Sequence, residues 1–138
     1  MNTIELRLQP GSAPGYPVVQ VLINGRDLLD RVRAVELPQA TADGQPDLAG
    51  SYEGLAPHQW IELPERGEDG SAAVYRCGDC GELGCWPLRV RIVRRGGTVT
   101  WRDFQQPHRG WTYERLGPFT FREDEYDRAV AGVAKRAK

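Results

Sequence analysis

The sequence lacks the features that would direct the chain to a membrane or to nucleic acid. No apolar run approaches the roughly 20 residues that a membrane-spanning helix needs. The 138 residues carry 18 Lys and Arg against 19 Asp and Glu, a formal net charge of −1. Because the net charge is so small, no overall field draws the chain onto a polyanion. We therefore expect no membrane and no nucleic acid as partner, which leaves another protein or a second copy of this chain.

Cysteine and histidine are scarce, with three Cys and two His in the whole chain. The cysteine count is odd, and no charged and then apolar leader follows Met1. Both features are typical of proteins in a reducing compartment. We therefore expect a cytoplasmic protein.

The sequence also lacks the patterns that announce catalysis. It shows no Ser-His-Asp order, no glycine-rich phosphate loop before a helix, and no paired carboxylates in an apolar setting. We nominate no catalytic residue. The expected function is that of a binding or interaction module and not of an enzyme.

The first half of the chain predicts a hairpin followed by a helix. Apolar and polar residues alternate from Ile4 to Leu8, and Val18 to Ile23 forms a second apolar run before Asn24-Gly25. Alternation with period two indicates strands. Asp27 is placed to cap a helix with an apolar stripe, and Pro38 is expected to stop it. The stripe consists of Leu28, Val32 and Val35.

The second half predicts three strands and a terminal helix. Strands are expected over 72–76, 88–95 and 98–104, the last two joined at Gly96-Gly97, which tolerates a tight hairpin turn. A helix is expected from Glu123, with its apolar stripe at Tyr126, Val130 and Val133. Between the halves, 38–70 is expected to form short helical turns. The length suits one domain, 1–138, of the α+β class: an antiparallel sheet of four to six strands with two helices packed on it.

All three cysteines lie within Cys77-Gly78-Asp79-Cys80-Gly81-Glu82-Leu83-Gly84-Cys85. The favoured interpretation is that they are small buried hydrophobic residues in a tight turn, with no cofactor. The alternative is a zinc site made by Cys77, Cys80, Cys85 and His108, because thiolates and imidazole suit tetrahedral zinc. A redox dithiol at Cys77 and Cys80, with Cys85 as the resolving thiol, is the third hypothesis, although no helix start lies beside the motif to activate a thiol.

A second group of residues follows the last predicted strand. Asp103, His108 and Arg109 stand among Trp101, Phe104, Trp111 and Tyr113. Aromatic rings beside charged groups can form a pocket for a small ligand, so Asp103, His108 and Arg109 are the candidate ligand-binding residues. The alternative, which we favour, is a pair of core aromatic rings with an exposed Asp103–Arg109 ion pair.

Four segments together resemble a family of small bacterial proteins of the actinobacterial type. They are 23–29, 46–52, 80–88 and 101–109, and the most specific is Cys-Gly-x-x-Gly-Cys-Trp-Pro-Leu at 80–88. Members of that family often read Cys-x-Cys-Gly where this chain has Cys77-Gly78-Asp79-Cys80-Gly81. The resemblance covers most of the chain and implies no particular activity, cofactor or site residue.

Overall fold

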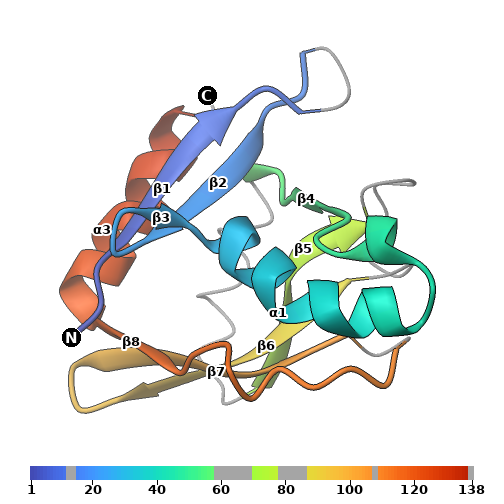
Figure 1. Ribbon diagram of the computed structural model, residues 1–138. Helices are drawn as coiled ribbons and strands as arrows, with labels where there is room; N and C mark the ends of the chain where they lie inside the picture. Colours follow the sequence, from blue (N-terminus) through green and yellow to red (C-terminus); the bar gives the residue numbers. More distant parts are fainter. Residues whose placement is uncertain (12–14, 58–69, 78–86, 107–108, 137–138) are drawn as a thin grey trace.

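The computed structural model of the chain describes residues 1–11, 15–57, 70–77, 87–106 and 109–136. These residues form two antiparallel sheets and two α-helices, which confirms the α+β class expected from the sequence. The strands divide between the two sheets instead of forming one (Figure 1). Among the described residues, no helix is long and apolar enough to cross a membrane.

The first sheet contains the predicted hairpin. Its strands pair in the order β1-β2-β3, and their bounds are β1 Ile4–Gln9, β2 Val18–Ile23 and β3 Arg26–Asp27. Leu6 lies opposite Val21, and both side chains are buried. The alternation of the sequence therefore does set which face of the hairpin enters the core.

The second sheet is a meander of five strands, β4-β5-β6-β7-β8. Gly96 and Gly97 both have positive φ, of 57° and 80°, and they join β6 to β7 in the predicted hairpin. The short strands β4 and β8 were not predicted. The bounds are β4 Tyr52–Gly54, β5 Gly70–Cys77, β6 Leu88–Arg95, β7 Thr98–Gln105 and β8 Phe119–Arg122.

The two sheets are connected by backbone hydrogen bonds at two places. The Asn2 N–H donates to the Thr120 carbonyl at 2.8 Å, and the Val19 N–H donates to the Leu55 carbonyl at 2.8 Å. At the second place the chains are very close, because a Cβ atom on Gly54 would lie 2.3 Å from the Val19 carbonyl oxygen. Only glycine fits there. The sheets consequently share one apolar core.

Helix α1 spans Leu28–Ala42, and its N-terminus is capped as predicted, with the Asp27 carboxylate accepting from the Leu29 N–H at 2.9 Å. The prediction that Pro38 ends this helix is wrong. Proline removes one backbone donor, here the one that would bond to the Ala34 carbonyl. Ala34 is exposed, so water can satisfy that carbonyl, and Gln39 on the next turn donates its side-chain N–H to the Val35 carbonyl at 3.2 Å.

The continued helix changes which residues face the core. Its buried positions are Leu28, Val32, Glu36 and Ala40, a repeat of four residues. Val35, which the predicted stripe included, is only partly buried. A glutamate thus occupies a fully buried position on the apolar face. After α1, the short 3₁₀ helix η1 (Pro46–Leu48) is a helical turn of the kind expected for 38–70, so that expectation is met in part. Part of that range, 58–69, lies outside the described residues.

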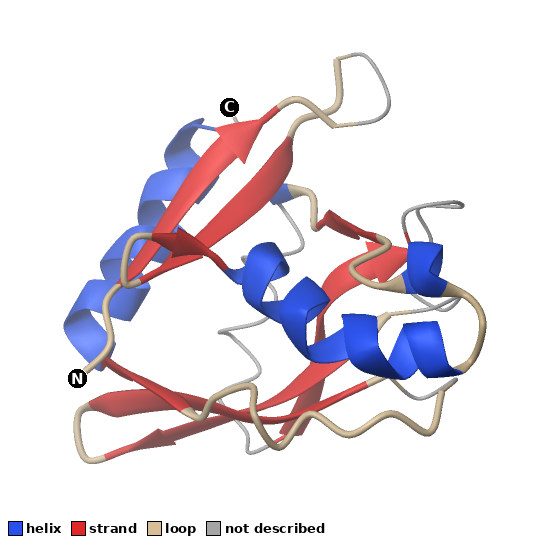
Figure 2. Cartoon of the chain, in the orientation of Figure 1, coloured by secondary structure: helices blue, strands red, loops and turns tan. Residues whose placement is uncertain are grey.

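Helix α3 spans Glu123–Arg136 and begins at the predicted residue. It packs mainly along β1 and also contacts β7 and β8, whereas α1 contacts β2, β3 and η1. Figure 2 shows the two helices on different flanks of the strands. The predicted stripe is confirmed, because Tyr126 and Val133 are 0% exposed and Val130 is 7% exposed.

The stripe of α3 yields a stability prediction. Val133→Asp should lower the free energy of unfolding by several kcal/mol, because it buries an unpaired carboxylate in the shared core. Arg128→Ala on the exposed face of the same helix should change it by no more than about 0.5 kcal/mol. Urea denaturation of both variants measures the difference. Similar losses in the two variants would show that the α3 face has been assigned incorrectly.

Candidate functional site

A β-bulge in β7 gives the second sheet its most unusual feature. Arg91 of β6 lies opposite Arg102 of β7, and Arg89 lies opposite Gln105, so Asp103 and Phe104 together face one residue of β6. Asp103 has φ of +55°, in the left-handed region that aspartate tolerates better than most residues. Such bulges bend a strand and redirect its side chains.

The bulge determines which of the two bulged residues is buried. Trp101 points into the core, so strict alternation would bury Asp103 and expose Phe104. With the extra residue in place, Phe104 is 3% exposed and the Asp103 carboxylate lies on the surface. Its Oδ2 is 3.7 Å from the Arg102 Nε. Both side chains are at least half exposed, so this ion pair adds little stability.

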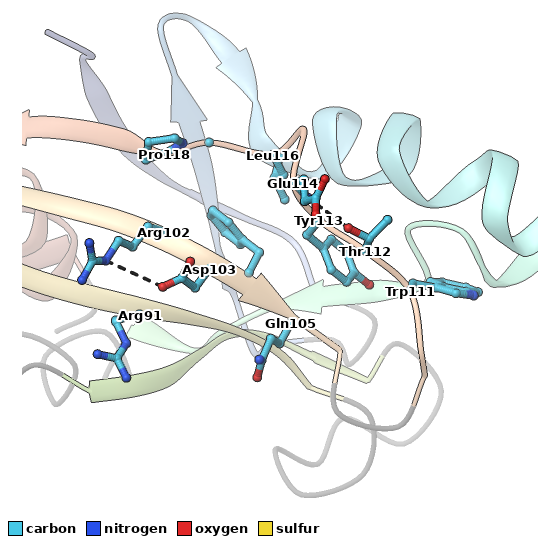
Figure 3. Close-up of a pocket in the computed structure, with 12 residues that line it drawn as sticks. Arg91, Arg102, Asp103, Gln105, Trp111, Thr112, Tyr113, Glu114, Leu116 and Pro118 are labelled. Atoms are coloured by element: carbon cyan, nitrogen blue, oxygen red, sulfur yellow. Dashed lines mark hydrogen bonds and ion pairs between the residues drawn. The ribbon is translucent and has the colours of Figure 1, made fainter.

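A pocket of about 700 Å³ lies between this bulge and the segment 111–118, and we call it the bulge pocket. Figure 3 shows Arg91, Arg102 and Asp103 on the strands, with Tyr113 and Glu114 on the opposite wall. Its lining residues are Arg91, Arg102, Asp103, Phe104, Gln105, Trp111, Thr112, Tyr113, Glu114, Leu116, Gly117 and Pro118.

The strand side of the bulge pocket brings like charges together. Arg91 and Arg102 are direct cross-strand partners, and both are exposed. Like charges directly opposite each other in an antiparallel pair destabilise it by a few tenths to about 1 kcal/mol. Asp103 neutralises one of the two guanidinium groups. The strand side therefore presents a net positive charge beside one carboxylate.

The opposite wall is held on α1 by three successive residues. The Trp111 Nε1–H donates to the Asp43 carboxylate at 2.9 Å. The Thr112 N–H donates to the Gln39 side-chain oxygen at 2.8 Å, and the Gln39 amide donates back to the Thr112 carbonyl at 2.9 Å. The Tyr113 hydroxyl donates to the Glu36 carboxylate at 2.5 Å. The partners 36, 39 and 43 lie on one face of the helix.

Glu36 is the centre of a buried polar cluster beneath this wall. Its side chain is 0% exposed and accepts from the Gly50 N–H at 2.8 Å, from the Tyr52 hydroxyl at 2.6 Å and from the Tyr113 hydroxyl. The Gln106 amide donates to the Tyr52 hydroxyl at 3.1 Å. Multiple donors of this kind offset the cost of burying a carboxylate.

The two tyrosines of this cluster act as donors at neutral pH. Burial, followed by the hydrogen bond to Glu36, raises the pKa of Tyr113 far above its usual range. Burial, followed by the charge of Glu36, also raises the pKa of Tyr52. Both hydroxyls thus keep their protons, which the Glu36 carboxylate needs for its hydrogen bonds. The cluster is an anchor for the wall and not a source of protons.

Of the three predicted ligand-binding residues, Asp103 and Arg109 are described by the structure and His108 is not. Asp103 lines the bulge pocket, and the Arg109 guanidinium lies 4.9 Å from the centre of the Trp111 ring beside it. His108 lies outside the described residues. Trp101 belongs to the core, in edge-to-face contact with Phe121 and Tyr126, as the structural interpretation expected.

The cysteine turn lies mostly outside the described residues, since Cys80 and Cys85 fall within 78–86. Cys77 is the last residue of β5, where it pairs with Tyr52 of β4. Within the described ranges, no group of three or more His, Cys, Asp or Glu side chains is arranged to hold a metal ion. The zinc site and the redox dithiol therefore stay predictions.

Sequence reasoning missed Arg102, Gln105, Glu114 and Glu36, and it interpreted Arg91 as part of a solvated strand face. Two signals pointed to some of them. A regular strand through Trp101 would bury Asp103, and this conflict indicates a bulge. Extending the stripe of Leu28 and Val32 by four residues reaches Glu36, a buried carboxylate that needs donors. Arg91, Arg102 and Gln105 resemble the polar residues of any solvated strand.

The Glu36 cluster can be tested by its effect on stability. Glu36→Gln should lower the free energy of unfolding by about 1–3 kcal/mol, because the amide group presents a donor where the carboxylate accepts. Tyr113→Phe should cost less in the Glu36→Gln background than in the wild type, since the two residues share one interaction. Thermal denaturation of the single and double variants, with exposed Glu114→Gln as control, measures this. Additive losses would contradict the coupling.

Comparison of this chain with protein-family models, with curated proteins and with solved structures finds no match. The functional argument consequently depends on the geometry of the site.

Proposed function

We propose that this chain is a non-catalytic binding module and that the bulge pocket is its ligand site. The ligand is peptide-like and polar, and it carries charges of both signs. An acidic group of the ligand would lie against Arg91 and Arg102, and a basic group against Asp103 or Glu114. A peptide segment of a protein partner has this chemistry, as does a free dipeptide.

One observation carries this proposal: the bulge turns a carboxylate outward beside two guanidinium groups that face each other across the sheet. The Arg91–Arg102 pairing is unfavourable by itself, and an anion between them would relieve it. The volume of about 700 Å³ lies within the range of small-molecule pockets. The strand residues Arg91, Arg102 and Gln105 are exposed and therefore accessible to a ligand.

The lining favours binding over chemistry. Among the residues that the structure describes, the lining includes no Ser, Cys, Lys or His. Its two hydroxyl groups belong to Thr112 and Tyr113, and that of Tyr113 donates to Glu36. The polar groups of the wall are committed to the fold, because Trp111 and Tyr113 donate to α1 and the Thr112 hydroxyl accepts from the Glu114 N–H at 3.5 Å. These contacts position the wall and leave the charged strand residues for recognition.

The pocket is tested by titrating the labelled chain with a panel of acidic, basic and mixed-charge dipeptides. We expect mixed-charge dipeptides to shift the amide resonances of 102–105 and 111–117. Asp103→Asn should weaken that binding at least tenfold while keeping a residue that tolerates positive φ. Arg102→Gln should weaken it to a similar degree.

Arg7→Gln is the matched control, because Arg7 is exposed on β1 and pairs with Glu5, away from the pocket. It should bind as the wild type does. Shifts confined to other parts of the chain, or equal binding by Asp103→Asn and the wild type, would contradict the proposal. Denaturation midpoints of all variants separate a binding defect from a folding defect.

We propose zinc binding by the cysteine turn as the second function, on one observation about the strands. β5 and β7 both pair antiparallel with β6. They therefore run in the same direction, and their C-terminal ends lie at the same end of the sheet. Cys77 ends β5 and Gln105 ends β7, while β6 begins there at Leu88. The chain therefore leaves β5 toward the cysteine turn and β7 toward residues 106–109 at the same end of the sheet. This arrangement favours one zinc site that is shared by Cys77, Cys80, Cys85 and His108.

Metal analysis of chain purified without chelator tests this function. One zinc per chain is expected, and Cys80→Ser should lose it. Zinc should also raise the denaturation midpoint of the metal-free chain, since a metal that binds only the folded state stabilises it. Magnesium, which prefers oxygen ligands, should have no such effect. An unchanged midpoint with zinc would contradict a structural zinc site.

A further inference from the structure

A second pocket lies on the other side of the segment that walls the bulge pocket. Its volume is about 380 Å³, and Leu116, Gly117 and Pro118 line both pockets. Four parts of the chain contribute to its described lining: Asn2 before β1, the turn into β3 with Arg26, the first half of α1, and the approach to β8, all of which can be followed in Figure 1.

The charge of this pocket is of one sign. Arg26, Arg31 and Arg115 line it, each from a different one of these parts, and the described lining residues include no Asp or Glu. We call it the arginine pocket. The neighbouring carboxylate of Asp27 is already used, because it accepts from the Leu29 N–H at 2.9 Å and from the Gln20 amide at 3.0 Å.

Among the described residues, the three arginines differ from those that are paired with a carboxylate. Five others form ion pairs with carboxylates, namely Arg7, Arg76, Arg94, Arg102 and Arg122. Within the described part of the chain, Arg26, Arg31 and Arg115 form none. The Arg31 guanidinium lies 5.6 Å from the centre of the Phe119 ring, and its Nε is buried without a hydrogen-bond acceptor among the described residues. A buried donor of this kind is unfavourable unless something accepts from it.

Two asparagines add donors to the same lining. The Asn2 side-chain oxygen accepts from the Thr120 N–H at 2.8 Å, and the Asn24 side-chain oxygen accepts from the Thr3 N–H at 2.9 Å. In these bonds the side-chain oxygen of each asparagine is the acceptor. The NH₂ group of each side chain is the hydrogen-bond donor that it can offer to a ligand. The polar side chains of the arginine pocket therefore offer donors and positive charge.

We propose that the arginine pocket binds a phosphate group, and specifically that of a phosphate monoester. A planar guanidinium matches a phosphate with two parallel hydrogen bonds, and three of them neutralise a dianion. The pocket also has an apolar side, made by Val35, Leu116 and Phe119, against which the organic part of an ester can lie. This site is separate from the bulge pocket, and it depends on no part of the function proposed above.

The full chain is titrated with phenyl phosphate, inorganic phosphate and acetate at constant ionic strength, followed by NMR. Phenyl phosphate should shift the side-chain Nε–H resonance of Arg31 and the backbone amide resonances of 24–26, 115–117 and 119. Inorganic phosphate should shift the same resonances with lower affinity. Equal affinity for the two would assign the site to free phosphate and overturn the ester. Acetate binding as tightly as either phosphate would overturn the phosphate assignment.

Arg26→Gln and Arg115→Gln are the decisive variants, because both side chains are exposed and make no ion pair within the described residues. Each should weaken phenyl phosphate binding at least tenfold. Without the ligand, each should unfold at the wild-type temperature or slightly above it, since one of three like charges is removed. Arg91→Gln in the bulge pocket should leave phosphate binding unchanged. Unchanged binding in both decisive variants, or loss of binding in Arg91→Gln, would overturn the proposal.

Discussion

The structure depends on the burial of one carboxylate. Glu36 stands on the apolar face of α1 at a position where a leucine or valine would be expected, and it receives three hydrogen bonds from three separate parts of the chain. An apolar residue there would fill the space but could bond to none of Gly50, Tyr52 and Tyr113. Removing the carboxylate alone would leave those donors buried without an acceptor. The glutamate therefore specifies how α1, β4 and the segment 111–118 fit together.

Both pockets follow from that arrangement. The segment 111–118 forms a wall of the bulge pocket with one side and a wall of the arginine pocket with the other. The residues that fasten it to α1 are Trp111, Thr112 and Tyr113, at its beginning, while Phe119 and Thr120 fasten its end through β8. A shift at either end would alter both pockets together. The bulge pocket and the arginine pocket thus have different charged residues but share the segment 111–118 as a wall.

The sequence predicted the elements whose apolar spacing is regular. The hairpin at Gly96-Gly97, the first two strands and the stripe of α3 are examples, because local periodicity and burial agree in them. The end of α1 was misjudged because the side-chain contacts that hold it beyond Pro38 come from Trp111, which bonds to Asp43, and from Thr112, which bonds to Gln39. Those partners have no local signal. Strands β4 and β8 were missed for a related reason, since each is short and gains its pairing only from a neighbouring strand.

The sequence identified some residues of the two pockets and not others. Asp103 and Trp111 were identified because unusual residue types cluster there, and both line the bulge pocket. Arg91 stands among Arg89, Arg94 and Arg95, a pattern typical of a solvated strand face, and the arginines of the second pocket have no local cluster of unusual residue types. Arg26 and Arg31 are close in sequence, but Arg115 is far from both and meets them only because β3, helix α1 and the approach to β8 surround one space. Charge that converges through tertiary structure is not visible in a single sequence.

The bulge at Asp103 adds a residue to the pocket edge that neither the strand pairing nor the core of the sheet needs. If this one residue is left out of β7, the strand reads Trp101, Arg102, Phe104, Gln105, and inward and outward side chains alternate without interruption. The pairing with β6 and the core beneath it have no need of the additional residue. Asp103 is in effect a one-residue insertion, so the composition of the pocket edge can change at this position without any compensating change in the core.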